Sequence, residues 1–392
     1  MIKSLEEISL SKGEYGGGFS AVEYFDGAPR YIRITDINEE GKLNETIKAP
    51  SGESKEWKKY KLKKGDILFA RTGATVGKTF LYDESYGDCI YAGYLIRFTP
   101  NPKICFPKYI YYYTKTPEYF SWVEMKQNVV AQPNINAKQY GSELDIPLPP
   151  LPQQQKIANI LDAADALRQN DKALVAKYDE LIQALFLDMF GDPVSNPKGW
   201  EKLELGKAID VRDGTHDSPK YVEKGYPLVT SKNIKNGELV LDNVNYISQE
   251  DYNKINNRSK VDVGDIIMPM IGTIGNPLLV DFEVNFAIKN VALFKFNDKS
   301  IITNIMLLNL LNGHFLERFS SLNNKGGTQK FVSLGDIRKM LVPIPPITLQ
   351  NQFAERVTLI EEQKTIAQAS LLKSEELFNS LLQKAFKGEL VN

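Results

Sequence analysis

The chain has 392 residues, of which 42% are hydrophobic and 25% charged, and its formal net charge is −1. These values are ordinary for a water-soluble globular protein of roughly two or three domains. The neutral charge balance disfavours tight DNA binding by this chain alone, because solitary DNA binders are often strongly basic, but it allows a local basic face. Two cysteines and two histidines are too few for a disulfide framework or a zinc site.

No apolar run approaches the length of about 18 residues that suggests a membrane span. The first seven residues lack the apolar stretch of a secretory signal. Both observations, with the low cysteine content, lead us to expect a cytoplasmic protein with no membrane partner.

Residues 1–148 form the first predicted domain. Runs at 31–34, 66–70 and 94–98 have the composition of strands, and turn signals separate them. Residues 108–125 predict one helix with an aromatic face directed at a core. The domain therefore mixes short strands with helices.

A glycine-rich motif, Gly-Ala-Thr-Val-Gly-Lys-Thr at 73–79, follows the strand at 66–70. It resembles a nucleotide-binding P-loop, which needs four residues between its glycines, whereas this motif has three. The corresponding segment at 272–277 has no lysine. We therefore interpret the motif as a turn at which Arg71, Thr72 and Lys78 face an anionic partner.

Residues 149–192 predict a long helix. The proline-rich string at 146–152 is extended and stiff, and neither proline nor glycine occurs between 153 and 190. Apolar residues recur in steps of three and four, as in a coiled-coil seam, and Gly191 marks the end. At 1.5 Å per residue, the stretch from 153 to 190 corresponds to a helix about 57 Å long.

The chain then repeats itself. Pro-Leu-Pro-Pro-Leu at 147–151 returns 196 residues later as Pro-Ile-Pro-Pro-Ile at 343–347, before a second long apolar-striped segment. This gives a second domain at 193–345 and a second helix at 346–392. The simplest packing of two such halves is an antiparallel helix pair with a pseudo-two-fold axis. Outside helices could add to its wide apolar faces to form a four-helix bundle.

Residues 215–218, Thr-His-Asp-Ser, contain the residue types of a catalytic triad but are contiguous, and a triad is assembled from separated positions. Two interpretations of Thr215 and His216 stay open. The residues can cap a turn, or they can contact the polar edge of a ligand.

Two polar loops occupy matching places near the ends of the two domains, at 132–136 and 325–330. Amides, hydroxyls and lysines are the groups that contact base edges and phosphates. An ordinary solvated loop is the equal alternative.

Taken together, these motifs resemble the specificity subunit of type I DNA restriction–modification systems. The resemblance is carried by 30–37, by 147–157, by Gly199 to Gly206, and by the Asp-Gly-Thr-His motif at 213–216 with Pro219. It implies an α+β fold of two similar mixed α/β target recognition domains, separated by two long antiparallel coiled-coil helices. It also implies that each domain reads half of a bipartite, asymmetric site in double-stranded DNA.

The resemblance further implies that this chain carries no chemistry and no cofactor. Two adenine methyltransferase subunits with S-adenosylmethionine are the implied partners, and restriction subunits with ATP and Mg²⁺ are possible ones. The alternative function is a non-catalytic coiled-coil scaffold whose modules bind proteins. Our candidate DNA contacts are Arg30, Arg33, Arg71, Thr72, Lys78, Gln132, Asn134, Thr215, His216, Lys232, Asn233, Lys325, Thr328, Gln329 and Lys330.

Overall fold

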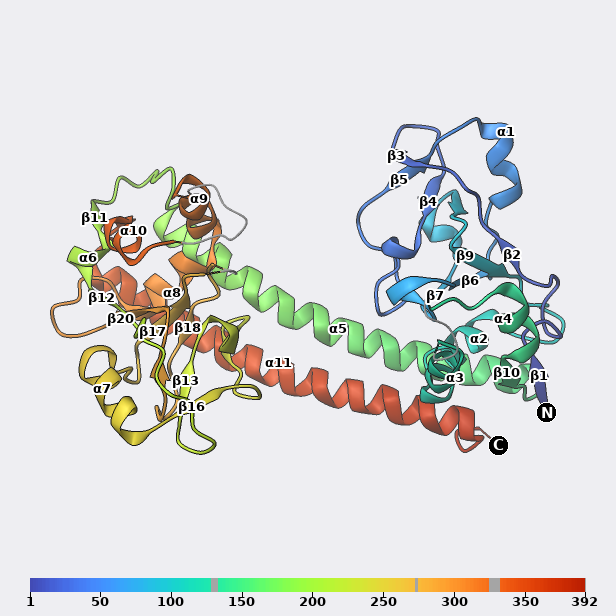
Figure 1. Cartoon of the computed structure of the whole chain (residues 1–392). Coiled ribbons are helices and arrows are strands. Elements are labelled where there is room, and N and C mark those ends of the chain that lie inside the picture. Colours follow the sequence, from blue (N-terminus) through green and yellow to red (C-terminus); the bar gives the residue numbers. More distant parts are fainter. Residues whose placement is uncertain (128–132, 272–273, 324–331, 392) are drawn as a thin grey trace. The chain divides into compact units, whose positions relative to one another are not determined.

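The computed structural model describes residues 1–127, 133–271, 274–323 and 332–391 (Figure 1). The chain divides into two compact units, of which unit 1 comprises residues 1–172 and 369–392 and unit 2 comprises residues 173–368. Both long helices, α5 (Leu151–Phe190) and α11 (Ile347–Lys387), contribute to each unit.

Unit 1 contains ten strands and four shorter α-helices within its described residues. The strands are β1 (Ile2–Ser4), β2 (Glu14–Tyr15), β3 (Ala21–Glu23), β4 (Arg30–Ile32), β5 (Lys48–Pro50), β6 (Ile67–Ala70), β7 (Thr79–Leu81), β8 (Cys89–Tyr91), β9 (Leu95–Phe98) and β10 (Asp145–Pro147). The shorter helices are α1 (Ser54–Trp57), α2 (Pro107–Tyr113), α3 (Pro117–Gln127) and α4 (Ala137–Glu143).

The centre of unit 1 is the antiparallel sheet β2-β9-β6-β7. Strand β6 is buried along its whole length, so both faces of the sheet are covered. Successive side chains of a strand point to opposite faces. Accordingly, Ile67 and Phe69 enter the core shared with α2, α3 and the long helices, whereas Leu68 and Ala70 enter a second core.

Unit 2 repeats this construction. Its strands are β11 (Lys202–Glu204), β12 (Asp210–Asp213), β13 (Tyr226–Val229), β14 (Ile234–Lys235), β15 (Glu238–Leu239), β16 (Asn245–Ile247), β17 (Ile266–Pro269), β18 (Leu278–Leu279), β19 (Ala287–Ile288), β20 (Val291–Lys295) and β21 (Leu341–Pro343). Its shorter helices are α6 (Leu205–Ala208), α7 (Gln249–Ser259), α8 (Asn304–Asn312), α9 (His314–Asn323) and α10 (Leu334–Lys339).

The strand pairings confirm the predicted duplication of the fold. The sheet β12-β20-β17-β18 corresponds to β2-β9-β6-β7, and its buried strand β17 again sends alternate side chains into two cores. The antiparallel pair β11–β21 matches β1–β10, and the parallel pair β13–β19 matches β4–β8. Two α+β modules of one topology therefore stand on the long helices.

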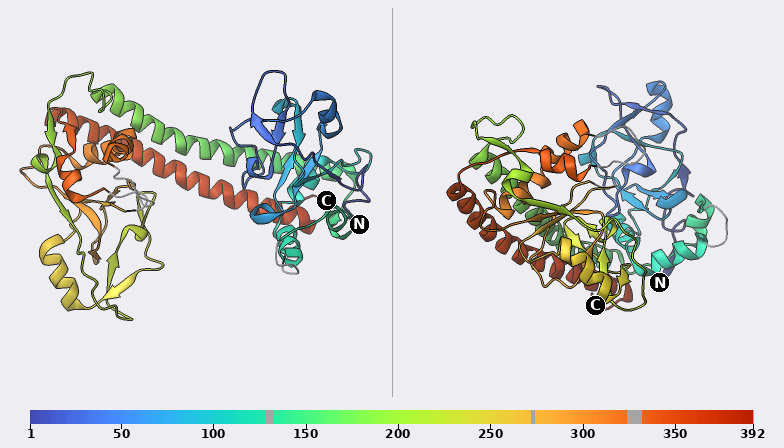
Figure 2. Two further views of the ribbon diagram at one scale, coloured as in Figure 1. Left: turned by 45° about the horizontal axis from the view of Figure 1, so that its top comes forward. Right: turned by 60° about the vertical axis from the view of Figure 1, so that its left-hand side comes forward.

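The long helices pack against each other in antiparallel fashion in each unit (Figure 2). In unit 1, Arg168 of α5 lies over the ring of Phe378, and Asp171 accepts a 3.3 Å hydrogen bond from Ser370 of α11. In unit 2, the α5–α11 contacts are an ion pair of Asp179 with Lys364 at 2.6 Å and a ring contact of Phe186 with Phe353. Later residues of α5 contact earlier residues of α11, so the two helices are antiparallel, as predicted.

A glycine follows each long helix, and the one after α5, Gly191, is predicted from the sequence. Gly191 and Gly388 have φ angles of 76° and 77° and follow the last residues of α5 and α11. A left-handed conformation at the first residue beyond a helix favours glycine, because a Cβ atom would be strained there.

The prediction of a single helix over 108–125 is wrong. The segment forms α2 and α3, separated by residues 114–116. Pro117 starts α3 and disfavours helical backbone at the residue before it. The Thr114 and Thr116 hydroxyls donate to the carbonyls of Tyr111 and Tyr113, which completes the break.

One buried glutamine joins each module to its long helix. In unit 1, Gln154 accepts a 2.9 Å hydrogen bond from the Phe106 N–H and donates to the Ile104 and Pro149 carbonyls at 3.1 and 2.8 Å. In unit 2, Gln350 makes the same three contacts, at 2.8, 3.1 and 2.8 Å. Its partners are Thr303, Ile301 and Pro345. Both glutamines are fully buried.

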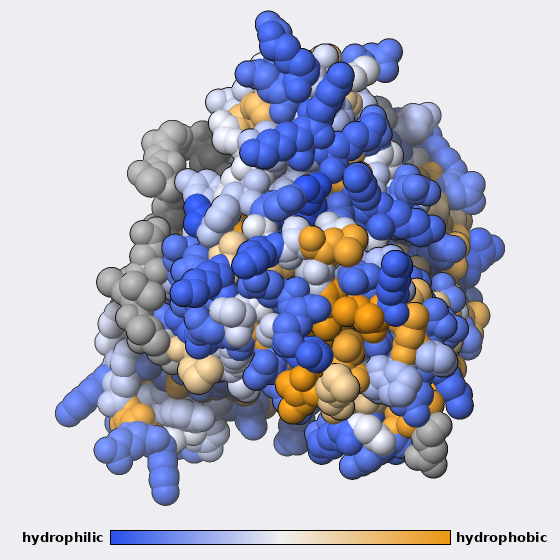
Figure 3. All heavy atoms as spheres, turned by 90° about the vertical axis from the view of Figure 1, so that its right-hand side faces the viewer, coloured by the Kyte–Doolittle hydropathy of each residue, from blue (hydrophilic) through white to orange (hydrophobic). Residues whose placement is uncertain are grey.

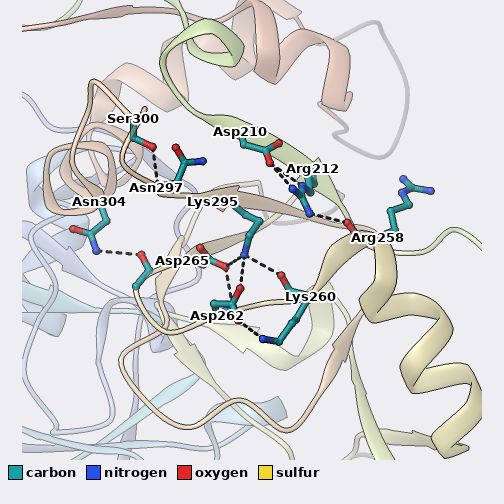
Figure 4. Close-up of polar contacts among 11 residues, drawn as sticks. Asp210, Arg212, Arg258, Lys260, Asp262, Asp265, Lys295, Asn297, Ser300 and Asn304 are labelled. Carbon is teal, nitrogen blue, oxygen red and sulfur yellow. Dashed lines mark hydrogen bonds and ion pairs between the residues drawn. The ribbon is translucent and has the colours of Figure 1, made fainter.

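A second duplicated device is a buried aspartate beside a cation of the sheet. In unit 2, Asp265 accepts from the Asp262 N–H at 2.8 Å and from Lys295 Nζ at 2.6 Å, and Lys295 also donates to the Lys260 carbonyl (Figure 4). In unit 1, Asp66 and Arg97 make the corresponding contacts. Burial raises the pKa of Asp66, so the adjacent guanidinium offsets a real desolvation cost.

Lys115 lies between α2 and α3, with Nζ 3.3 Å from Thr79 Oγ1 and 4.6 Å from the centre of the Tyr111 ring. Burial, reinforced by the Arg168 charge, lowers the pKa of Lys115 from 10.5 to about 8. The lysine is therefore a group whose charged form the fold disfavours.

We predict that Gln154→Leu and Gln350→Leu each lower the free energy of unfolding by about 2–4 kcal/mol, because three buried backbone groups lose a partner. Urea denaturation monitored by circular dichroism measures this loss. The matched controls are the exposed Gln155→Leu and Gln352→Leu, which we expect to cost about 0.5 kcal/mol or less. Equal losses in the buried and exposed variants would contradict the proposed anchoring.

We predict that Lys115→Met removes a rise in stability between pH 8 and pH 10.5. In that window the unfolded lysine binds a proton and the folded lysine, with its pKa of about 8, does not, so stability increases with pH. At pH 7 we expect Lys115→Met to raise the free energy of unfolding by on the order of 2–3 kcal/mol. Thermal melts of the variant and the wild type across this pH window measure the change. Parallel pH profiles for the variant and the wild type would disprove the assignment.

Candidate nucleic-acid interface

Four of the predicted contact residues meet in unit 1. Arg33 and Arg71 line a cavity of about 610 Å³, and Thr72 and Asn134 line a neighbouring one of about 740 Å³. The cavities share Tyr94 and Ile34, so they form one continuous depression, which we call the unit 1 groove.

Arg71 is held in the groove by aromatic rings. Its guanidinium carbon lies 5.0 Å from the ring centre of Tyr15 and 5.9 Å from that of Tyr94, and Nε donates to the Gly93 carbonyl at 3.2 Å. Stacking on aromatic faces stabilises a guanidinium and restricts its orientation. Arg71 is therefore a positioned cation.

Arg33 is fixed by Asp36, which is almost fully buried. The guanidinium donates to both carboxylate oxygens, at 3.0 and 2.6 Å, and the Arg33 N–H donates to the same carboxylate at 2.9 Å. This hydrogen bonding raises the pKa of Arg33. The pairing leaves the Arg33 side chain 30% exposed at the wall of the groove.

Backbone pairing brings the glycine-rich turn to the polar loop. Thr72 and Asn134 form an antiparallel bridge, the Ile135 N–H donates to the Arg71 carbonyl at 2.9 Å, and the Gly73 N–H donates to the Pro133 carbonyl at 3.2 Å. Residues 73–75 form a single 3₁₀ turn followed by β7, with no P-loop helix. The interpretation as a turn is therefore confirmed.

Two predicted residues of unit 1 have intramolecular partners outside the groove. Arg30 donates to the carbonyls of Asn44 and Thr46, at 2.5 and 3.4 Å. Lys78 pairs with Glu39 at 2.6 Å and is 19% exposed. Both can be seen as supports for the loop at 38–46, and their role as DNA contacts stays a prediction.

In unit 2, Thr215 and His216 lie on a tight turn beside β19. The Thr215 N–H donates to the Ile288 carbonyl at 3.0 Å. A Cβ atom on Gly214 would lie 2.4 Å from that same oxygen, so only glycine fits before Thr215. His216 is 62% exposed, and its ring nitrogens lie 2.7 Å from Asp213 Oδ2 and 2.7 Å from Asn290 Oδ1.

The neighbouring candidates Lys232 and Asn233 differ in exposure. Lys232 is exposed on a short 3₁₀ turn, whereas Asn233 is 5% exposed. The Asn233 amide accepts from the Thr230 N–H and hydroxyl and donates to the Val240 carbonyl. Its amide is engaged within the fold, as a cap of its own turn.

The remaining candidates, which come from the two polar loops, lie outside the described residues. They are Gln132, Lys325, Thr328, Gln329 and Lys330.

Sequence reasoning missed several residues that complete these surfaces. Tyr15 and Tyr94 frame Arg71 in unit 1. In unit 2, Arg258 and Thr215 line a depression of about 340 Å³, and the Asp213 carboxylate binds Arg258 as well as His216. Asp213 stands in the Asp-Gly-Thr-His motif, which could have indicated it, whereas Arg258 at the end of α7 carries no sequence signal.

Among residues 1–127, 133–271, 274–323 and 332–391, no group of three or more His, Cys, Asp or Glu side chains is arranged to bind a metal. Within those same ranges, no helix is long and apolar enough to cross a membrane. Guanidinium, imidazole and hydroxyl groups on rigid turns are suited to hydrogen bonding a polar ligand.

A further kind of surface is apolar. Leu167, Leu174 and Leu181 follow one another at intervals of seven on α5 and are 46%, 42% and 47% exposed. On α11, Leu359 and Ile366 are both 63% exposed. Figure 3 shows a further apolar patch, which lies on unit 1 on the face near both chain termini.

The duplicated α+β modules each carry a polar-lined depression and are each anchored to the long helices, which is the architecture of a protein with two similar binding domains. The family description "Type I restriction modification DNA specificity domain" matches residues 10–176 and 197–373. The chain therefore belongs to the family of type I restriction–modification specificity subunits. Members of this family are recognition components and not catalysts, so the chain is not itself an enzyme.

Two specificity subunits from other proteins of this family are similar to the chain in sequence. The chain is 24% identical over 314 residues to the type I restriction enzyme EcoBI specificity subunit of Escherichia coli, a match that covers 71% of this chain and 65% of that protein. It is 22% identical over 344 residues to the MjaVIII specificity subunit of Methanocaldococcus jannaschii, with coverages of 83% and 79%.

Solved structures support the fold. The type I restriction–modification S subunit from M. genitalium matches with a TM-score of 0.56 at 16% identity, over 98% of this chain and 96% of that one. A chain from a structure on complex assembly and conformational transition of the type I system gives a TM-score of 0.56 at 17% identity, with coverages of 100% and 98%.

Proposed function

We propose that each recognition domain, 1–148 and 193–345, reads one half of a bipartite site in the major groove of double-stranded DNA. The convergence of Arg33, Arg71, Thr72 and Asn134 on the unit 1 groove carries this proposal. Arginine reads guanine and asparagine reads adenine, because the major groove presents a distinct set of donors and acceptors for each base pair.

The two half-sites differ in sequence. The unit 1 groove offers Arg71 between aromatic rings and Arg33 on a carboxylate, whereas the unit 2 surface offers His216, Thr215 and Arg258 among carboxylates. Different donors at corresponding places select different bases. The target is therefore asymmetric.

The long helices dock two adenine methyltransferase subunits, and restriction subunits can join the same complex. The exposed leucines at intervals of seven on α5 support this, because such a stripe suits the packing of further helices. The partners supply S-adenosylmethionine, ATP and Mg²⁺, and this chain supplies recognition. The complex works in the cytoplasm, where the DNA is.

The length of the helices sets the spacer between the two half-sites. α5 is a continuous helix of 40 residues that contributes to both units. A helix rises 1.5 Å per residue, so each turn of about 5.4 Å spans roughly one to two base pairs of DNA, and the helix length can fix the spacer.

We predict that exchange of residues 193–345 for the recognition domain of another specificity subunit changes one half of the methylated motif and leaves the other intact, because each domain reads independently. Methylome sequencing of cells that carry the exchanged chain and its methyltransferase measures the motif. The reciprocal exchange of residues 1–148 is the control and must change the other half. A motif that changes in both halves, or in neither, would refute the modular assignment.

We predict that four residues inserted into the middle of α5 lengthen the spacer by about one to two base pairs, because four residues add about 6 Å of helix. The specific bases stay the same. The control is a four-residue insertion in the loop after Asn196, which leaves α5 unchanged. Methylation mapping gives both spacers, and an unchanged spacer in the α5 variant would eliminate the helix as the measure.

A further inference from the structure

Lys254 and Arg258 both line the unit 2 depression, and Arg258 has a buried partner. Its side chain is 62% exposed, yet its Nη2 group donates to Asp213 Oδ1, and the Asp213 side chain is 7% exposed. Charge-assisted hydrogen bonds of this kind restrict a guanidinium more strongly than neutral ones. One end of the fork is thus anchored while the rest faces the depression.

The carboxylate that anchors Arg258 is itself held in place. Oδ2 of Asp213 lies 2.7 Å from His216 Nε2, and the other ring nitrogen of His216 lies 2.7 Å from Asn290 Oδ1. Asp213 ends β12, directly before the glycine that the close approach of Ile288 requires. The two carboxylate oxygens therefore serve two different partners, and neither partner can rotate freely.

The backbone that carries Arg258 is fixed as well. The Arg258 carbonyl accepts a 3.1 Å hydrogen bond from Arg212 Nη1, and Arg212 is paired with Asp210 at 2.6 Å. Figure 4 shows the Arg258 side chain leaving this contact in a direction away from the Lys295 network. Backbone and guanidinium are both positioned before any ligand binds.

We propose that Arg258 reads a guanine in the half-site of the second recognition domain and that Asp213 is its positioning residue. This assignment rests on the proposed function. Guanine presents the O6 and N7 acceptors to the major groove, and a guanidinium fork satisfies both at once. A fork that is already oriented loses less entropy on binding and tolerates fewer wrong bases.

The surroundings favour a base edge over a phosphate. Asp213 binds Arg258, and Asp217 and Asp251 line the same depression. Carboxylates repel a phosphate, which carries a full negative charge, more strongly than they repel the uncharged edge of a base pair. A phosphate contact would also need no oriented fork, because phosphate contacts position the protein without reading sequence.

In unit 1, Tyr15 and Arg71 have an arrangement that corresponds to that of Asp213 and Arg258. Tyr15 directly precedes Gly16, as Asp213 directly precedes Gly214, and both glycines lie too close to a neighbouring carbonyl for a Cβ atom. Tyr15 orients Arg71 through its ring, as Asp213 orients Arg258 through its carboxylate. The residue before the tight glycine thus directs an arginine in both modules.

The test is the methylation motif of the complex of the full chain with its methyltransferase, for Arg258→Ala and Arg258→Lys. We expect discrimination to fall about 10- to 100-fold at one guanine of the second half-site, and the first half-site to stay unchanged. Asp213→Asn should relax the same position to a smaller extent. A purely structural role of Asp213 would not single out one base.

The control is Lys260→Ala, because Lys260 is 66% exposed and pairs with Asp262 at 2.7 Å but lies outside the depression. Its motif should match that of the wild type. A wild-type motif in both Arg258 variants overturns the assignment. So does a uniform loss of affinity for all sequences with a salt slope reduced by about one, which marks a phosphate contact. A wild-type complex without any defined motif overturns the proposed function itself.

Discussion

The rest of the structure depends on one buried side chain in each half, the glutamine near the start of each long helix. Gln154 and Gln350 bind three backbone groups apiece, and each set ties the turn that begins α2 or α8 to the first turn of α5 or α11. A buried amide with all its partners is rigid, because any displacement exposes several unpaired groups to an apolar core. The orientation of a recognition module on its helix is thereby set by hydrogen bonds and not by apolar packing alone.

On this shared frame the two modules place different reading groups. The buried aspartates Asp66 and Asp265 close the same turn, and the strands beside them pair in the same order. The two modules differ in the side chains that they present to solvent, as with Arg71 between tyrosines in unit 1 and Arg258 on a carboxylate in unit 2. The rigid elements supply the stability of the fold, so the exposed turns can carry different side chains for recognition.

The sequence predicted the frame better than the surfaces. Apolar residues in steps of three and four, and Gly191 at the end of α5, indicated the two long helices to within a few residues. Local periodicity and backbone strain determine such helices. The break between α2 and α3 was missed, since it depends on the Thr114 and Thr116 hydroxyls as much as on Pro117. Arg71 and Thr72 were predicted on one turn and Arg33 and Asn134 elsewhere, and the tertiary structure brings all four to one groove. Arg258 escaped prediction because its importance comes from Asp213, which lies 45 residues away.

The same pairing is consistent with the proposed reading of DNA by a chain whose net charge is −1. Arg33 is committed to Asp36 and Arg258 to Asp213, so each local charge is partly neutralised before DNA arrives. Such cations contribute little to sequence-independent attraction, which grows with the number of phosphates neutralised. They would instead contribute a fixed orientation of the guanidinium, which is what distinguishes one base edge from another. On the proposed function, a recognition subunit of this kind would gain specificity at the expense of affinity, and phosphate contacts made by its partner subunits would hold the complex on DNA.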